Sequence, residues 1–141
     1  MPSNSEIILS NQVHPGDSTT ETVTGDKYKG DGYYGRSDGL HTVQINLIGF
    51  IGTIEIQGTL AIDPAEEDWF TVELESSNSS TIGFVDTTGA ITTTSPTVSS
   101  VTYTSNETNS NNYNFTGNFV WIRAKVSNWT DGNITSIQLN H

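Results

Sequence analysis

The sequence predicts an all-β protein, an antiparallel β-sandwich of jelly-roll type, and three observations indicate this fold class. Ser, Thr, Asn and Gly dominate, only 33% of the residues are hydrophobic, and leucine is scarce beside the β-branched residues. From His41 onward apolar and polar residues alternate, as in strands with one buried face. Turn signals such as Asp131-Gly132 recur at the spacing of hairpins. We expect one β-sandwich domain over residues 41–141, preceded by an extended N-terminal arm over residues 1–40.

The N-terminal arm is predicted to contain only short strands, at residues 6–10 and 20–24. Residues 14–39 hold six glycines and a single aliphatic residue, Val23. A segment of this composition buries too little apolar surface to form a core of its own. It is therefore expected to be an extended arm or a long surface loop.

A hairpin is predicted around residues 49–52, because a four-residue loop there closes the register on both sides. Leu47 then faces Ile54, and Ile45 faces Ile56, so that one face of both strands is apolar. The same loop places Phe50 and Ile51 at the apex of the hairpin. Two positions remain for these side chains, beneath a neighbouring loop of the same chain or inside a contact with another chain, and we favour the second.

A second hairpin is predicted at Asp131-Gly132, the strongest short turn signal in the chain. With a two-residue loop, Val126 faces Ile137 and Ala124 faces Leu139. Further strands are expected at 69–75, where Phe70 alternates with other apolar residues, and more weakly at 80–85 and 99–104. Residues 65–68 are expected to form an acidic loop or a single helical turn.

The net charge of -11 argues against nucleic acid as a partner, because the chain cannot neutralise a row of phosphates. No apolar run reaches the length of a membrane span, and the first residues lack the pattern of a secretory signal. There is no cysteine, and His14, His41 and His141 have no metal-ligand spacing. We therefore predict no catalytic, cofactor or metal residues and no enzymatic activity, with a calcium ion in an acidic loop as an alternative to a solvated loop.

Aromatic and basic residues supply the candidate interface. Three of the five basic residues lie beside tyrosines in the arm, which makes it either a docking arm or a segment that folds back over the sheet edge. The alternation predicts Trp121 and Arg123 on the outer face of their strand, as a contact between subunits, as a sugar platform, or beneath the arm. The predicted interface residues are Phe50, Ile51, Lys27, Tyr28, Tyr33, Tyr34, Arg36, Trp121 and Arg123.

Two segments carry a resemblance to a known class of proteins. Residues 49–74 read GFIGTIEIQGTLAIDPAEEDWFTVEL, and residues 116–141 read TGNFVWIRAKVSNWTDGNITSIQLNH. Both resemble the β-sandwich structural proteins of tailed-bacteriophage virions, over roughly residues 41–141, whereas the first 40 residues match no pattern.

The resemblance implies a non-enzymatic building block of a virion, assembled in the host cytoplasm. It implies a capsid decoration protein or a neck or tail accessory protein, which binds capsid or tail proteins and copies of itself, for instance as a trimer. The alternative from the residues is a carbohydrate-binding module, in which Trp69, Trp121 or Tyr113 stacks on a glycan.

Overall fold

The computed structural model describes residues 5–17, 19–35, 39–76, 82–85, 91–94 and 97–140, and nearly all of their regular structure is antiparallel β-sheet. This confirms the predicted all-β, antiparallel class. The one short helix in this part of the chain is the 3-10 turn η1 (Glu66–Asp68), at the position expected for an acidic turn, so no described helix is long enough to cross a bilayer. The strands are β1 (Ser5–Leu9), β2 (Gln12–Val13), β3 (Glu21–Thr24), β4 (Tyr28–Lys29), β5 (Leu40–Thr59), β6 (Phe70–Thr71), β7 (Leu74–Ser76), β8 (Ile82–Val85), β9 (Ile91–Thr94), β10 (Thr97–Val98), β11 (Val101–Thr116) and β12 (Trp121–Asn140).

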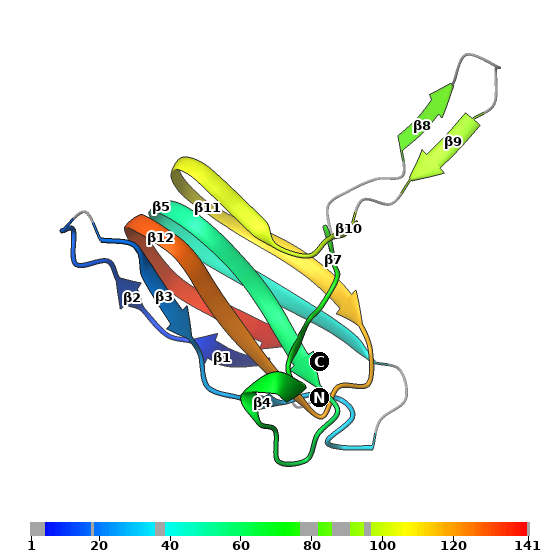
Figure 1. The fold of residues 1–141 in the computed structure, drawn as a ribbon. Helices are drawn as coiled ribbons and strands as arrows, with labels where there is room; N and C mark the ends of the chain where they lie inside the picture. The colour runs from blue at the N-terminus through cyan, green and yellow to red at the C-terminus, as the bar shows by residue number, and fades with distance from the viewer. Residues whose placement is uncertain are drawn as a thin grey trace.

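Three long strands, β5, β11 and β12, each bend in the middle, so that the sheet folds over on itself (Figure 1). Hydrogen bonds join both sides of the fold into one ten-stranded sheet, with the order β1-β12-β5-β11-β7-β10. The fold thus differs from a sandwich of two sheets that are not hydrogen-bonded to each other. Layer A consists of β1, β2 and residues 40–48, 107–116 and 133–140. Layer B consists of β3, β4, β6 and residues 53–59, 101–104 and 121–127.

The two predicted hairpin ladders are wrong, although the residues predicted as ladder partners are all buried. Ile45 lies between Ile137 of β12 and Asn111 of β11 in the sheet, so both of its ladder positions are occupied and Ile56 cannot pair with it. Val126 likewise lies between Ile54 and Val23. The apolar residues expected to be ladder partners instead line the inside of the fold, where they are buried together in one core.

Register shifts in the ladders mark the bends. The β5–β12 ladder is interrupted near Asp131, and the β5–β11 ladder is interrupted near Glu107. Extra residues of this kind are β-bulges, which bend a strand and increase its twist. At the bends Gly49 has a φ of 62° and Gly132 a φ of 82°. The turn signals in the sequence therefore mark real changes of direction, but the chain bends within a strand instead of reversing in a tight hairpin.

Phe50 corrects the expectation of an exposed apolar apex. The bulge turns its side chain to the inside of the bend, where it is fully buried. Its ring lies 6.0 Å from that of Tyr103 and 6.3 Å from that of Trp129, measured between centroids. Ile51 is half-buried. Of the two positions that the sequence left open, Phe50 occupies the one inside its own chain.

Side chains and backbone fasten the three bends to one another. The Asn106 amide of β11 donates to the carbonyl oxygen of Gly49 at 2.9 Å and to the Asp131 carboxylate at 3.0 Å. A Cβ at residue 132 would lie 2.1 Å from the Gly49 carbonyl oxygen. This close approach, together with the positive φ, explains why glycine stands at position 132.

The segment from β1 to β4 lies along β12 on the side away from β5. β1 and β2 pair with residues 133–140, and β3 and β4 pair with residues 121–129. The short strands predicted at 6–10 and 20–24 correspond to β1 and β3. The N-terminal segment is therefore extended, as expected, and forms an edge of both layers.

The predicted strand 69–75 is interrupted. β6 pairs with β5 in layer B, and β7 pairs with β11 in layer A, so the chain leaves one layer for the other between them. The alternation fails at this crossing: Val72 and Leu74 are buried, whereas Phe70 is exposed and rests against Phe119.

Candidate functional site

The candidate site is the end of the folded sheet opposite the bends, which we call the loop end and define as residues 27–34, 60–70 and 117–123 (Figure 1). Here β5 of layer B ends, β12 begins, and the loop after β4 crosses between them. The loop end brings together Lys27, Tyr28, Tyr33, Trp121 and Arg123, which the sequence predicted as interface residues.

Trp121 lies at the centre of the loop end and is covered on one side by the N-terminal segment. The Lys27 ammonium lies 4.6 Å from the Trp121 ring centroid, and the Tyr33 ring centroid lies 5.1 Å away. The indole N–H donates to the Ile62 carbonyl oxygen at 2.9 Å. These contacts support the interpretation in which the arm folds back over Trp121, and the cation–π geometry places a positive charge beside the ring.

The tyrosines of the arm differ in their exposure. Tyr28 is half-buried and packs against the core. Tyr33 and Tyr34 are exposed, with their ring centroids 5.6 Å apart and Lys29 at 4.6 Å from the Tyr33 centroid. The turn that carries them is anchored by the N–H of Gly32, which donates to the Phe119 carbonyl oxygen at 2.9 Å. The backbone of this turn is thus fixed, while its two aromatic side chains face outward.

Arg123 corrects the expectation of an outward Trp–Arg pair. It is buried, and its Nε donates to Gln57 at 2.7 Å. Its two terminal nitrogens donate to the Glu66 carboxylate at 2.9 and 3.0 Å, and the guanidinium lies 4.3 Å from the Trp69 ring centroid. Hydrogen bonds from Arg123 hold the pKa of Glu66 below its usual range. Because the loop 60–69 covers it, Arg123 is engaged within its own chain.

Two exposed aliphatic residues at the loop end are absent from the predicted interface. Leu60 is 65% exposed and Ile62 is 82% exposed, on the segment that leaves β5. They form an exposed apolar group with Tyr33 and Tyr34, because the Ile62 carbonyl oxygen accepts from the Trp121 indole and the Tyr33 ring packs on that of Trp121. Phe70 is also exposed, but it rests against Phe119 on the other face of the sheet. The only signal in the sequence was an apolar residue on each side of Ala61, directly after a strand has ended.

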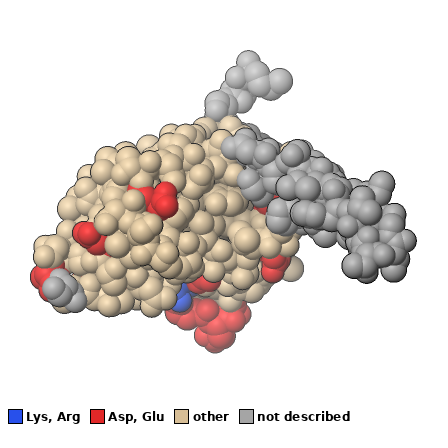
Figure 2. Space-filling model, turned by 90° about the horizontal axis from the view of Figure 1, so that it is seen from above, with Lys and Arg blue, Asp and Glu red and all other residues tan. Residues whose placement is uncertain are grey.

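Charges of both signs border this apolar group. Lys27 and Lys29 lie on one side, and the exposed acidic residues Asp63, Glu67 and Asp68 lie in the covering loop. Figure 2 shows acidic groups gathered at one edge of the molecule beside a basic one, and others spread singly. An apolar centre with a charged border is the usual composition of a protein–protein contact.

Of the other predicted residues, Arg36 lies outside the described part of the chain. The aromatic rings proposed as sugar platforms are engaged within the chain. Arg123 occupies one face of Trp69, Lys27 and Tyr33 lie against Trp121, and Tyr113 is half-buried against the core.

His14, Asp17 and Glu21 are the one group of potential metal ligands found among the described residues. Their ligand atoms lie within 4.8 Å of one another. However, the His14 Nδ1 accepts from the N–H of Gly16 at 2.9 Å, so that its Nε2 carries the proton and donates to the Thr19 carbonyl oxygen at 3.0 Å. Neither nitrogen then has a lone pair for a cation, and we assign His14 a structural role in this loop.

Comparison with known proteins identifies the fold. No family model matches the sequence, and no curated protein matches it. Among solved structures, the crystal structure of SPBc2 prophage-derived protein YomS is similar, with a TM-score of 0.56. The match covers 99% of this chain and 92% of that chain, at 11% sequence identity. The two chains therefore share a fold over nearly their whole length.

Proposed function

We propose that this protein is a non-enzymatic structural component of a phage particle, either a capsid decoration protein or a neck or tail accessory protein. Three observations support the proposal: the fold shared with a prophage-derived protein over almost the whole chain, the resemblance of residues 49–74 and 116–141 to virion proteins, and the exposed apolar group at the loop end. The same loop end is the surface through which the protein binds its neighbour in the particle.

The observation that carries the proposal is the exposure of Leu60 and Ile62, at 65% and 82%. Full burial of one aliphatic side chain contributes about 1.5–3 kcal/mol. Scaled by these exposed fractions, the two side chains together supply about 2–4 kcal/mol before the cost of association. Contacts of this size are weak singly, but they are sufficient when many copies bind an already ordered lattice. The neighbouring protein is expected to present an apolar patch with both basic and acidic groups around it.

The proposal is tested on particles purified from the bacterial culture whose genome encodes this chain. We expect mass spectrometry to find the protein in the particles and immunogold electron microscopy to place it on the capsid, neck or tail. If purified particles lack the protein, the proposal is wrong.

The docking surface is tested by the double variant Leu60→Ser, Ile62→Ser. It is expected to fold and to be lost from the particles, because it removes the apolar centre of the contact. The matched control is Val13→Ser, which changes a side chain that is 61% exposed but lies in β2, away from the loop end. Normal incorporation of the double variant contradicts docking through the loop end.

A further inference from the structure

The outer face of layer A is a grid of uncharged hydrogen-bonding side chains. It is formed by alternate residues from Thr42 to Asn46 in β5, from Ser110 to Asn114 in β11 and from Ser136 to Asn140 in β12. The register places them in three rows across the sheet, because each residue of β5 has one partner in β11 and one in β12. Every one of these nine positions is Ser, Thr, Asn or Gln.

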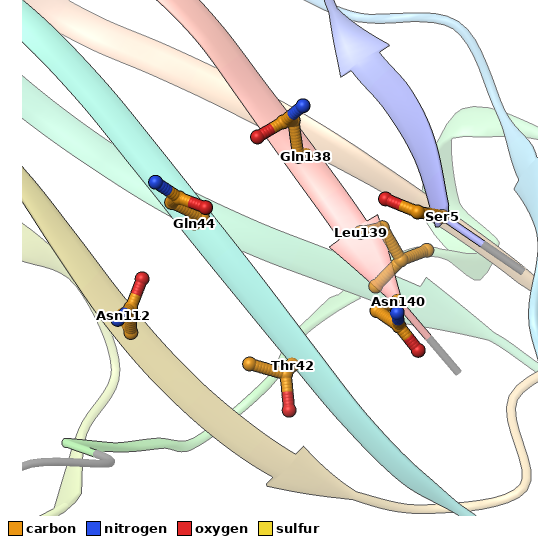
Figure 3. A pocket seen from close by; sticks show the side chains of 7 residues that line it. All are labelled: Ser5, Thr42, Gln44, Asn112, Gln138, Leu139 and Asn140. Atoms are coloured by element: carbon orange, nitrogen blue, oxygen red, sulfur yellow. The ribbon is translucent and has the colours of Figure 1, made fainter. Parts of the chain in front are cut away.

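The middle row lies in a hollow of about 390 Å³ (Figure 3). We call the three rows and this hollow the amide face. Gln44, Asn112 and Gln138 come from three neighbouring strands and line this hollow, with Ser5 of β1 at its side. Among the described residues, the side-chain amide of Gln138 has no hydrogen-bond partner, so its two donors and its acceptor remain available. Ile7 and Ile48 are exposed in the strands that border or continue the same face.

The face is uncharged in a strongly acidic chain. The protein carries 16 acidic residues and a net charge of -11. At the chain's own 15% of charged residues, nine positions would carry about one charge. The described side chains of the amide face have none. Depletion of charge is the feature that distinguishes the centre of an interface from the rest of a surface.

We propose that the amide face is a self-association surface, through which two copies of the chain pair face to face about a two-fold axis. A contact of this kind uses the same patch on both partners, so the patch must complement itself. Amides and hydroxyls are both donors and acceptors, which makes identical faces complementary in a way that a carboxylate-rich face is not. The proposal rests on this face alone and does not require the loop end to bind a virion.

Electrostatics favours this orientation over others. Two copies that each carry a net charge of -11 repel, and the repulsion is greatest where carboxylates approach within a Debye length of about 8–10 Å. Contact through the amide face keeps the acidic loop at residues 63–68 on layer B, on the outside of the pair. The charged surface thereby remains in solvent.

The area of the face is adequate for a specific pair. In layer A, β1, β12, β5 and β11 contribute 5, 8, 9 and 10 residues. At about 3.3 Å per residue and about 4.8 Å between strands, they give a projected area of roughly 510 Å² per copy. The two copies together then bury roughly 1,000 Å², which is about the minimum expected of a biological interface. We therefore expect a dimer that dissociates on dilution.

The test is sedimentation velocity of the purified full chain over a concentration series. The expected result is a dimer of twice the monomer mass of 15.3 kDa. Gln138→Glu replaces an amide by a carboxylate of nearly equal shape and, through the two-fold, places two negative charges in one contact. It should weaken the dimer at least tenfold, and more at low salt than at high salt. Asn11→Asp, the same chemical change at an exposed position outside the face, should leave the dimer unchanged.

Two further arms keep the test independent of folding and of the proposed function. A mixture of Gln138→Glu with Gln138→Lys chains should associate again, which a misfolded variant cannot do. The variant Leu60→Ser, Ile62→Ser should remain dimeric even if it is lost from particles. A wild-type chain that is monomeric at every concentration, or a dimer unaffected by Gln138→Glu, overturns the proposal. So does a monomer whose Gln138 amide resonance shifts on addition of maltohexaose, because the face would then be a glycan site.

Discussion

The two outer faces of the folded sheet are built from the same three strands and have opposite chemistry. On layer B, Glu55 accepts hydrogen bonds from Gln57 and Thr71, and Arg123 forms an ion pair with Glu66 of the covering loop. On layer A, the corresponding outward positions are uncharged. The chain covers the charged face with its own loop at residues 60–69, whereas the described residues leave a hollow on the neutral face. Alternation along a strand thus determines which side chains point outward. Whether an outward face is exposed depends on a loop that is distant in sequence, which here covers layer B.

The bend at residue 132 is the strongest test of this division into two layers. Gly132→Ala adds a Cβ at a φ of 82° and within 2.1 Å of the Gly49 carbonyl oxygen, so the bends can no longer approach. We expect a loss of about 4 kcal/mol or more in the free energy of unfolding, measured by urea denaturation. Gly35→Ala is the matched control, because its φ is 70° but nothing lies within 4 Å of the added Cβ. It should cost about 1 kcal/mol. Equal losses for the two variants would show that the bends do not approach as described.

The inside of the bend is tested next, by Phe50→Ala. Phe50 is fully buried between the rings of Tyr103 and Trp129, so its removal leaves a cavity at the junction of the layers. The expected loss is about 3–5 kcal/mol. Phe70→Ala, at an exposed position on layer B, should lose less than half as much in the same thermal or urea unfolding measurement. Normal stability of Phe50→Ala would contradict the burial of Phe50 and support the exposed apex predicted from the sequence.

The smallest expected effect concerns the charged face, and it depends on pH. Arg123 holds the pKa of Glu66 below its ordinary value of 4.5, so this ion pair stabilises the folded state above that pH. The contribution is lost as the pH falls through the lowered pKa and Glu66 becomes protonated. Wild type should therefore be slightly more stable than Glu66→Gln at pH 7, and the difference should shrink as the pH falls below 4.5 and through the lowered pKa. Glu67→Gln, in the same turn, is the control. A difference between wild type and Glu66→Gln that persists in acid would argue against the ion pair as its source.

The sequence predicted the buried faces well and the partners poorly. Ile45 and Ile137 were expected on the apolar faces of two separate hairpins, and both are fully buried. Their ladder partners were not predictable, because a hairpin and a bulged bend have the same local pattern of glycines between alternating strands. The choice between them depends on which strand occupies each edge, and for Ile45 these are residues of β11 and β12 far along the chain.

The candidate site was predictable only in part, for a related reason. Lys27 and Tyr33 were named from the cluster of aromatic and basic residues in the arm, and Trp121 from the alternation of its own strand. The structure brings the three together. Arg123 was expected to be on the outer face of its strand, because it alternates with the inward-facing Ile122. Its burial comes from Glu66 and Trp69, more than 50 residues earlier, and no local pattern reveals that contact.

The central place of β12 has a consequence for the order in which the protein is made. β1, β2, β3, β4 and β5 all pair with β12, which is the last described strand to leave the ribosome. Until residues 121–140 are synthesised, these five strands have no ladder with the strand that joins them. Strand pairing across such long separations is slow. These ladders must therefore wait until residues 121–140 have been synthesised, and until then the edges of β1 and β5 that pair with β12 are exposed to chaperones, or to one another on neighbouring nascent chains.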